Sequence, residues 1–551
     1  MSKAILLGID GATLDLLLPW AEQGKLPNLS RVLAEGAHGT LSSTLPPYSA
    51  QAWVSMMTGK GPGKHGVLDF FEAGKGPGHH AFISSALING EAIWDTLSRQ
   101  GLKVGMVNVP LTYPPVAVKG YMVSGFMTPK GREDYTYPLE LREEILGVTG
   151  QYDPDPWDLV DPAKDVATFE RWMDIAEQAA AYLHKQYPVD LYASVIQAID
   201  QLQHSFWDAL AVDSTQDTPQ NQQVWSTIEA CYARMDAAIG KRLQWLDSDT
   251  TLFLASDHGF QRADRWFHIN RWLAQRGYLS FATAERGMAP SLAARLGWTR
   301  EGIKEWVRRM DPLGLRRLLG RFARASIADR LDDAIAMPID WTQTTAYCGS
   351  RTSEGIFINL KGRDPQGIVE PGAQYEDLRT RIMGELVELI DPATGQTAVN
   401  GAYRREEVHS GQFVARMPDI LLDFDDKPYL VSESTSVREV FEPIAAADIQ
   451  GRHHSLGTFA AVGPHIAPGV VVRASIVDIA PTILYAMGQP IPDDMDGRVL
   501  EEVFTPQFRN THHIRHEPAM GLVKSRSEAS AYSQEEEESM LQRLRDLGYL
   551  S

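Results

Sequence analysis

The chain has little cysteine, and this bears on both its chemistry and its compartment. Only Cys231 and Cys348 occur among 551 residues, far apart and in no C-x-x-C arrangement. A disulfide framework or a thiolate metal site is therefore not expected. The low cysteine content suits a reducing compartment, and we expect a cytoplasmic protein.

Long apolar runs are also missing. The opening segment MSKAILLGIDG contains a six-residue apolar run, residues 4–9, which Asp10 ends. This run is too short for a signal peptide and predicts a buried strand. No segment reaches the roughly 18 uninterrupted apolar residues that a membrane-spanning helix needs. We therefore expect no membrane span.

Positive charge is scarce relative to negative charge. Lys and Arg number 52 against 71 Asp and Glu, which gives a net charge of −19. This balance argues against nonspecific binding of nucleic acid, and we expect no specific nucleic-acid partner. Hydrophobic residues make up 44% of the chain, which is enough for a packed core.

Short aliphatic runs alternate with helical stretches along most of the chain. Residues 166–187 have a helical pattern, and the runs that end in Gly, Asp or Pro are residues 3–10, 103–110, 190–200, 251–257 and 457–464. Such runs are typical of buried strands in a mostly parallel sheet. The alternation predicts an α/β fold with a mostly parallel central sheet flanked by helices, whose ligands gather beyond the carboxyl ends of the strands.

Two segments depart from this pattern and divide the chain. Residues 281–336 contain no convincing strand, and residues 295–330 hold ten Lys or Arg against four Asp or Glu. We expect a helical basic insertion here, either a solvated pair of helices or a lid that contacts an anionic substrate. The predicted division is a first core part at 1–280, the insertion at 281–336, a second core part at 337–510 and a tail at 511–551.

The tail is predicted to end in a helix. Ser533 is a suitable N-cap, acidic residues follow in the first turn, and Met540, Leu544 and Leu547 share one face. We expect this helix to dock on the core. A contact between copies in a homo-oligomer is the alternative.

Carboxylates and imidazoles cluster at the predicted strand ends. Any one of them could be a capping or structural residue, but together they provide metal ligands without sulfur, which suit Zn²⁺, Mn²⁺ or Fe²⁺. They are Asp10, Asp200, His204, Asp257, His258, His453 and His454.

Six segments carry a family resemblance that spans nearly the whole chain. They are LLGIDGATLDLLLPW, SAQAWVSMMTGKGPGKHGVLDF, DQLQH, SDHGF, GRHHSLGTF and SIVDIAPTILYAMGQPIPDDMDGRVL. In this order they resemble the alkaline phosphatase superfamily, and most closely its type I phosphodiesterase/nucleotide pyrophosphatase branch.

The resemblance implies a nucleophile and two metal ions. The branch has a Ser or Thr nine residues before a Thr-Gly pair, here Thr58-Gly59, which selects Ser49. It implies two divalent ions, Zn²⁺ with Mn²⁺ or Fe²⁺ as alternatives. The implied ligands of one ion are Asp200, His204 and His453, and those of the other are Asp10, Asp257, His258 and the Ser49 oxygen. His453 is preferred over His454 because the branch places this ligand four residues before a glycine, here Gly457.

The function implied is hydrolysis of a small-molecule phosphoester through a covalent phosphoseryl intermediate at Ser49, with diesters favoured. Asp69 and Phe70 stand where nucleotide pyrophosphatases have an asparagine, which puts nucleotide substrates in doubt. The sulfatase motif C-x-P-x-R is absent, and no arginine is assignable to a phosphomonoester. The alternatives are a phosphomonoesterase or phosphotransferase on the same core, and a non-catalytic metal-binding scaffold.

Overall fold

The computed structural model describes residues 2–72, 81–156, 166–211, 219–282, 337–437, 439–444, 451–521 and 531–546. They form two compact units. The first comprises Met1–Arg262, Val408–Met417 and Asp448–Arg543, and the second comprises Ala263–Glu407, Pro418–Ala447 and Leu544–Ser551. The expected basic insertion lies almost wholly outside the described residues.

The first unit is built on a nine-stranded sheet. Its strands, in spatial order, are β18 (Val471–Ser475), β2 (Ala37–Ser42), β17 (Leu456–Val462), β7 (Thr250–Ala255), β1 (Lys3–Ile9), β6 (Leu191–Ile196), β3 (Val104–Val109), β4 (Gly120–Ser124) and β5 (Thr136–Tyr137). β17 runs antiparallel to both of its neighbours and β5 runs antiparallel to β4, while the other pairings are parallel. The predicted mostly parallel sheet is confirmed. Of the strands expected from the sequence, the one at 457–464 (β17) has the opposite direction, as does the short edge strand β5.

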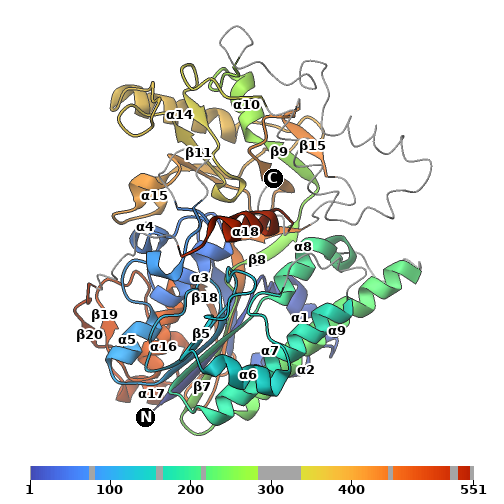
Figure 1. Cartoon of the computed structure of the whole chain (residues 1–551), viewed down its shortest axis with the longest axis vertical. Helices are drawn as coiled ribbons and strands as arrows, with labels where there is room; N and C mark the ends of the chain where they lie inside the picture. The colour runs from blue at the N-terminus through green and yellow to red at the C-terminus, as the bar shows by residue number, and fades with distance from the viewer. Residues whose placement is uncertain are drawn as a thin grey trace. The chain divides into compact units, whose positions relative to one another are not determined.

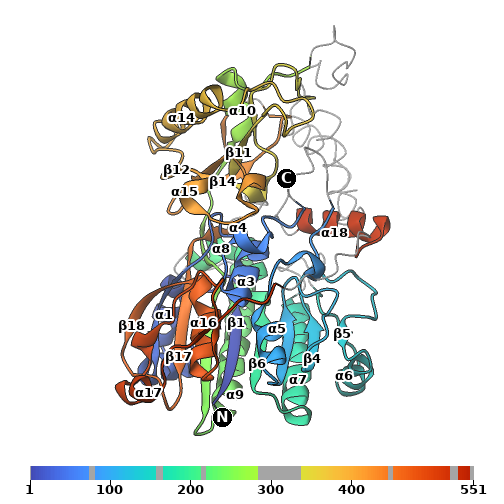
Figure 2. The ribbon, with the colours of Figure 1, turned by 90° about the vertical axis from the view of Figure 1, so that its left-hand side faces the viewer.

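Helices cover both faces of this sheet and lie on opposite sides of it in Figure 1, whereas Figure 2 looks onto one of the two faces. The packing alternates along β1: Ala4 and Leu6 belong to one core cluster, and Ile5 and Leu7 to the other. One face carries α3 (Ser49–Thr58), α5 (Ile93–Arg99) and α16 (Ile479–Ala486). The other carries α1 (Leu14–Glu22), α2 (Pro27–Glu35), α7 (Val166–Gln186), α8 (Ala198–Ala211) and α9 (Pro219–Gln244). Burial on both faces explains why β1 reads as a continuous apolar run.

No helix within the described ranges is long and apolar enough to cross a membrane. The two cysteines are buried and free of disulfides.

The sequence suggests that residues 190–200 form a single strand, but the structure divides them between a strand and a helix. β6 ends at Ile196, and α8 begins at Ala198, so that Asp200 lies in the first turn of a helix. Because the helix follows the strand after a single residue, Asp200 still lies at the carboxyl edge of the sheet. His204 is on the same helix, four residues on, and therefore shares its face.

The second unit contains smaller sheets and two longer helices around its own core. One sheet has the order β10 (Ala346–Tyr347), β11 (Gly355–Ile358), β13 (Ile420–Asp423) and β12 (Gly401–Arg404). The other has the order β14 (Tyr429–Ser432), β9 (Arg265–His268) and β15 (Phe441–Pro443). The helices are α10 (Ile269–Gln275) and α14 (Ala373–Val387).

The predicted terminal helix is present as α18 (Gln534–Asp546). Ser533 caps it: its hydroxyl accepts from the Glu536 amide, and its own amide donates to the Glu536 carboxylate. Met540 is buried, as expected, and Arg543 pairs with buried Asp155 of the first unit. The helix is thus docked on the core through a buried ion pair as well as through apolar contacts.

Candidate active site

Three aspartates meet at the carboxyl edge of the central strands. β7, β1 and β6 are adjacent and parallel, with Gly8 in register with Val195 and Ala255. Asp10 follows the end of β1, Asp257 follows β7, and Asp200 lies in the first turn of the helix after β6. All three side chains are at most 1% exposed. Parallel pairing therefore collects three carboxylates at one place, away from water.

In each aspartate, one carboxylate oxygen accepts a hydrogen bond from the surrounding protein. The donors are Trp53 Nε1 to Asp10 Oδ2 at 3.1 Å, Gln201 Nε2 to Asp200 Oδ2 at 3.0 Å, and the Gly11 amide to Asp257 Oδ1 at 3.3 Å. These bonds fix the orientation of the three carboxylates.

The other oxygen of each aspartate faces one imidazole nitrogen. His258 Nε2 lies 3.4 Å from Asp10 Oδ1, 3.9 Å from Asp200 Oδ1 and 3.2 Å from Asp257 Oδ2. Within the described part of the chain, no hydrogen-bond donor reaches Asp10 Oδ1 or Asp257 Oδ2. The three aspartates thus present oxygens toward a common centre.

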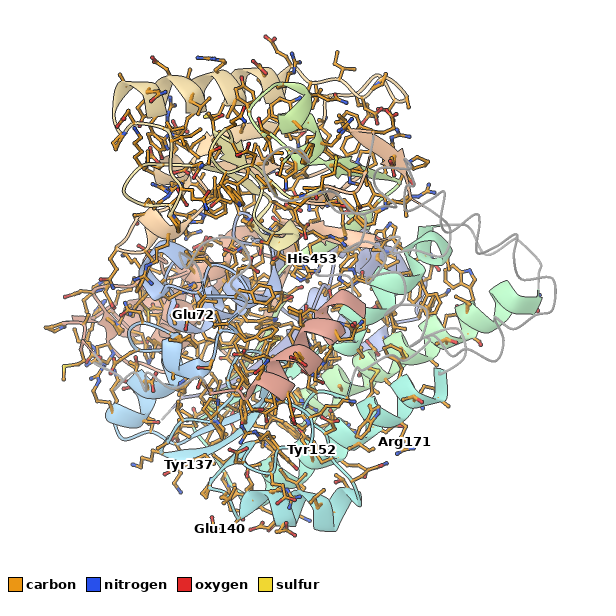
Figure 3. The ribbon with its side chains drawn as sticks, turned by 45° about the horizontal axis from the view of Figure 1, so that its top comes forward. Glu72, Tyr137, Glu140, Tyr152, Arg171 and His453 are labelled. Carbon is orange, nitrogen blue, oxygen red and sulfur yellow. The ribbon has the colours of Figure 1, made fainter. Side chains whose placement is uncertain are left out.

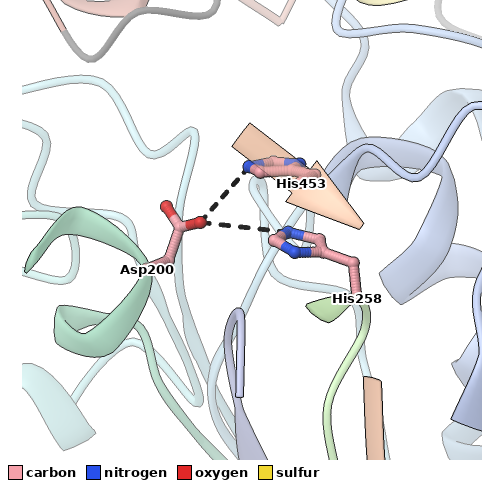
Figure 4. Close-up of side chains that lie close together, drawn as sticks. All are labelled: Asp200, His258 and His453. Atoms are coloured by element: carbon pink, nitrogen blue, oxygen red, sulfur yellow. Dashed lines mark ion pairs between the residues drawn. The ribbon is translucent and has the colours of Figure 1, made fainter. Parts of the chain in front are cut away.

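Two further histidines complete the cluster around Asp200. His453 Nε2 lies 3.3 Å from Asp200 Oδ1, and His204 Nε2 lies 3.5 Å from the same oxygen. The two histidine nitrogens are 3.0 Å apart. Figure 4 shows Asp200 facing both His258 and His453, with one ion pair drawn to each. His453 comes from β16 (Gly451–His454), which pairs with β8 (Gly259–Arg262) and so returns the chain to His258.

The three histidines have the same tautomer, which suits metal binding. The Nδ1 atoms of His204, His258 and His453 lie 3.3, 3.0 and 2.9 Å from the backbone carbonyls of Gly451, Gly259 and Pro47. Because a carbonyl only accepts, each Nδ1 carries a proton, and in the neutral ring each Nε2 then presents its lone pair to the centre. A backbone carbonyl on the far nitrogen is the usual partner of a metal-bound histidine.

Ser49 reaches the same centre from α3. It is the first residue of that helix and is 1% exposed, and its Oγ lies 3.1 Å from His258 Nε2. In the neutral ring that metal binding requires, this nitrogen accepts from the serine hydroxyl. Ser43 Oγ donates to the Asp257 carbonyl, which ties the preceding loop to the ligand cluster. All seven residues proposed from the sequence are therefore brought together.

His454 is placed differently from its neighbour. It is half-buried, and its Nδ1 accepts a hydrogen bond from the Leu456 amide at 3.0 Å. The alternation of side chains along β16 points it away from the face that carries His453. The geometry therefore favours His453 as the ligand of the pair.

The remaining polar residues of the 43–66 segment have structural partners. Lys60 pairs with Asp494, and Lys64 pairs with Asp496 at 2.5 Å. His65 Nε2 donates to buried Ser55 Oγ at 2.9 Å, because its Nδ1 accepts from the Val67 amide. Burial lowers the pKa of His65 to about 3, so this ring is neutral. These residues hold the loop after α3, as the sequence suggests.

Comparison with models of known protein families identifies the family of this chain. The family model described as "Type I phosphodiesterase / nucleotide pyrophosphatase" matches residues 4–456. The chain belongs to this family. The family consists of phosphoester hydrolases, and the protein is therefore an enzyme of this class.

Solved structures of low similarity accompany this match. Two structures of murine ectonucleotide pyrophosphatase/phosphodiesterase 5, one of them an inactive form in complex with AMP, are 12% identical in sequence, with a TM-score of 0.45. They match 92% and 91% of this chain and 100% of their own. At this similarity they carry no information on substrate. A comparison with curated protein sequences gave no match.

The electrostatics of this phosphodiesterase-family site call for cations. Burial raises the pKa of the Asp10 carboxyl well above its usual value, and the charges of Asp257 and Asp200 raise it further. Burial also raises the pKa of Asp257, against the effect of His258. Three buried carboxylates so close together repel one another unless positive charge lies between them. The donor set thus fits divalent ions bound by oxygen and nitrogen.

A separate cavity of about 110 Å³ lies between α7, α9 and β6. Tyr152, labelled in Figure 3, lines it together with Met173 and Arg242. None of the seven candidate site residues lines this cavity. The aspartate and histidine cluster is therefore the better supported site of chemistry.

The adjacent histidines give the first prediction. We expect His453→Ala to lose about one bound metal equivalent and most of the activity, because its Nε2 faces Asp200. His454→Ala should keep both ions and near-normal turnover. Metal content by plasma mass spectrometry and a chromogenic phosphoester assay measure both effects. A larger loss for His454→Ala would contradict the assignment.

Proposed function

We propose that the protein hydrolyses phosphoesters with two divalent metal ions and with Ser49 as a covalent nucleophile. The observation that carries the proposal is the position of Ser49 Oγ, 3.1 Å from His258 Nε2 and within a cluster of buried carboxylates. A serine placed only to cap the helix would have no reason to lie against metal-type ligands.

We assign the donor atoms to two groups, one for each ion, although His258 Nε2 lies near the carboxylates of both groups. Asp200, His204 and His453 form the first group, with mutual distances of 3.0 to 3.5 Å. Asp10, Asp257, His258 and the Ser49 oxygen form the second. We propose Zn²⁺, with Mn²⁺ or Fe²⁺ as alternatives, since the ligands are imidazoles and carboxylates without sulfur. Bound ions would stabilise negative charge on the attacking and leaving oxygens.

The charge of the loaded site would be near neutral. Two divalent ions contribute about +4, and three aspartates and the Ser49 alkoxide contribute about −4 in this count. A phosphate can then enter even though the whole protein carries −19. The position of Ser49 at the start of α3 adds amide N–H groups of the first helical turn, which favour an anion.

The residues of the chain then support two displacement steps. In the first, Ser49 Oγ forms a bond to phosphorus, the bond to the leaving alcohol breaks, and the alcohol carries away the serine proton. In the second, water attacks the phosphoserine, the Oγ–phosphorus bond breaks, and Ser49 regains a proton. Ser43 and His453, which are tied to the Asp257 and Pro47 carbonyls, keep the loop before Ser49 in place.

Replacement of the nucleophile gives the second prediction. Ser49→Ala should lower kcat by roughly 10³-fold or more, since the covalent step is lost, while both metal ions stay bound by six protein ligands. Activity and metal content are measured on the same preparation.

Ser55→Ala is the matched control for this variant. It also removes a buried hydroxyl from α3, but that hydroxyl contacts His65 and not the cluster. Ser55→Ala should keep most of the turnover. Near-normal turnover of Ser49→Ala would reject Ser49 as the nucleophile.

Charge also supports a preference for diesters. A phosphodiester brings one negative charge and a phosphomonoester nearly two, so a monoester needs a further cation once the ions are balanced. The two lysines that follow Ser49 in sequence are engaged by Asp494 and Asp496. Trp53 and Phe70 are fully buried in the core, so neither is exposed to contact the second ester group.

The third prediction compares the two ester classes. On one metal-loaded preparation, kcat/KM for bis(p-nitrophenyl) phosphate should exceed that for p-nitrophenyl phosphate. A clear preference for the monoester would contradict the charge argument.

We propose that this reaction takes place in the cytoplasm, because the chain has a low cysteine content. Both cysteines are buried, and burial raises the thiol pKa of Cys231 to about 12. Localisation of a tagged chain by cell fractionation tests this placement, and recovery outside the cytoplasm would contradict it.

A further inference from the structure

Trp53 contacts the active site although no ligand role was expected of it. Its indole Nε1 donates to Asp10 Oδ2 at 3.1 Å, and both residues are buried. The other oxygen of Asp10 faces His258 Nε2 at 3.4 Å. One oxygen of this carboxylate is thus held by the indole while the other is directed into the site.

Trp53 and Ser49 lie on the same helix. They are four residues apart in α3, which puts them on one face about one turn apart. The same rigid element therefore carries the proposed nucleophile and the group that orients Asp10. A shift of α3 would move both together.

The neighbouring strand is shaped to admit the indole. A Cβ atom on Gly8 of β1 would lie 2.4 Å from Trp53 Cη2 and 2.9 Å from Val195 Cγ2. Any larger residue at this position would push the ring away from the strand and from Asp10. Gly8, in the LLGID segment, thus makes room for the contact that orients the aspartate two residues later.

We infer that Trp53 is a positioning residue, which orients Asp10 for the metal ion held by Asp10, Asp257 and His258. The inference rests on the proposed function, because it presumes that these residues bind a metal. A neutral indole donor leaves the charge of the carboxylate in place and limits its rotation. Loss of an outer hydrogen bond of this kind typically weakens metal affinity about 10- to 100-fold.

The test compares two tryptophans of the same core. Trp53→Phe removes the N–H donor and part of the ring. Trp94→Phe is the matched control, because Trp94 of α5 is 3% exposed and belongs to the same apolar cluster. Within the described part of the chain, its Nε1 makes no hydrogen bond. The two variants lose similar volume, and only the first loses a bond to a metal ligand.

Zn²⁺ affinity is measured on the full-length chain by competition with a chromophoric chelator. We expect Trp53→Phe to weaken one of the two bound equivalents roughly 10- to 100-fold and to leave the other unchanged. Trp94→Phe should match the wild type. Excess Zn²⁺ should restore part of the activity of Trp53→Phe.

A second variant separates loss of the hydrogen bond from misfolding of Trp53→Phe. Incorporation of 3-benzothienylalanine at position 53 keeps the shape of the ring and replaces the N–H by sulfur, so it should reproduce the affinity loss. Equal affinities for the Trp53 variants and Trp94→Phe would overturn the inference. A wild-type chain that binds no Zn²⁺ would instead overturn the proposed metal centre, so the two failures are distinguishable.

Discussion

The mutual repulsion of three buried aspartates constrains the whole active site. Asp10, Asp200 and Asp257 are at most 1% exposed, and each directs an oxygen toward His258. Such a cluster costs folding free energy unless cations occupy it, because charged carboxylates are poorly solvated in the protein interior. The parallel sheet places the aspartates together, and the hydrogen bonds to their outer oxygens keep them from turning away.

The histidines and Ser49 are arranged around this cluster by chain segments distant in sequence. The β8–β16 ribbon brings His453 to His258 across almost two hundred residues. Segments that follow α3 and α16 also bind each other: the Gly61 amide donates to Asp496, and the Asp496 amide donates to the Gly59 carbonyl. These contacts show what the GKGPGK and DDMD segments do: they hold the loop after α3 in place, although they supply none of the candidate ligands.

Much of the fold, and the meeting of the candidate site residues at one edge of the sheet, could be predicted from the sequence. Burial on both faces gives continuous apolar strands, and polar residues follow their ends. The resemblance to a family then selected Ser49 and His453. Local pattern did not reveal that Asp200 lies in the first turn of a helix. It also did not reveal that β17 runs antiparallel, since apolar runs look alike in either direction. Trp53 was missed as a contact of Asp10 because its contact depends on a glycine in another element.

The covalent role of Ser49 can be tested most directly through the stereochemistry at phosphorus. One diastereomer of a P-chiral phosphorothioate diester is hydrolysed in ¹⁸O-labelled water by the metal-loaded enzyme, and the configuration of the product is determined by phosphorus NMR. Two in-line displacements, first by Ser49 and then by water, predict overall retention. Inversion would show a single displacement by water and would contradict a phosphoseryl intermediate.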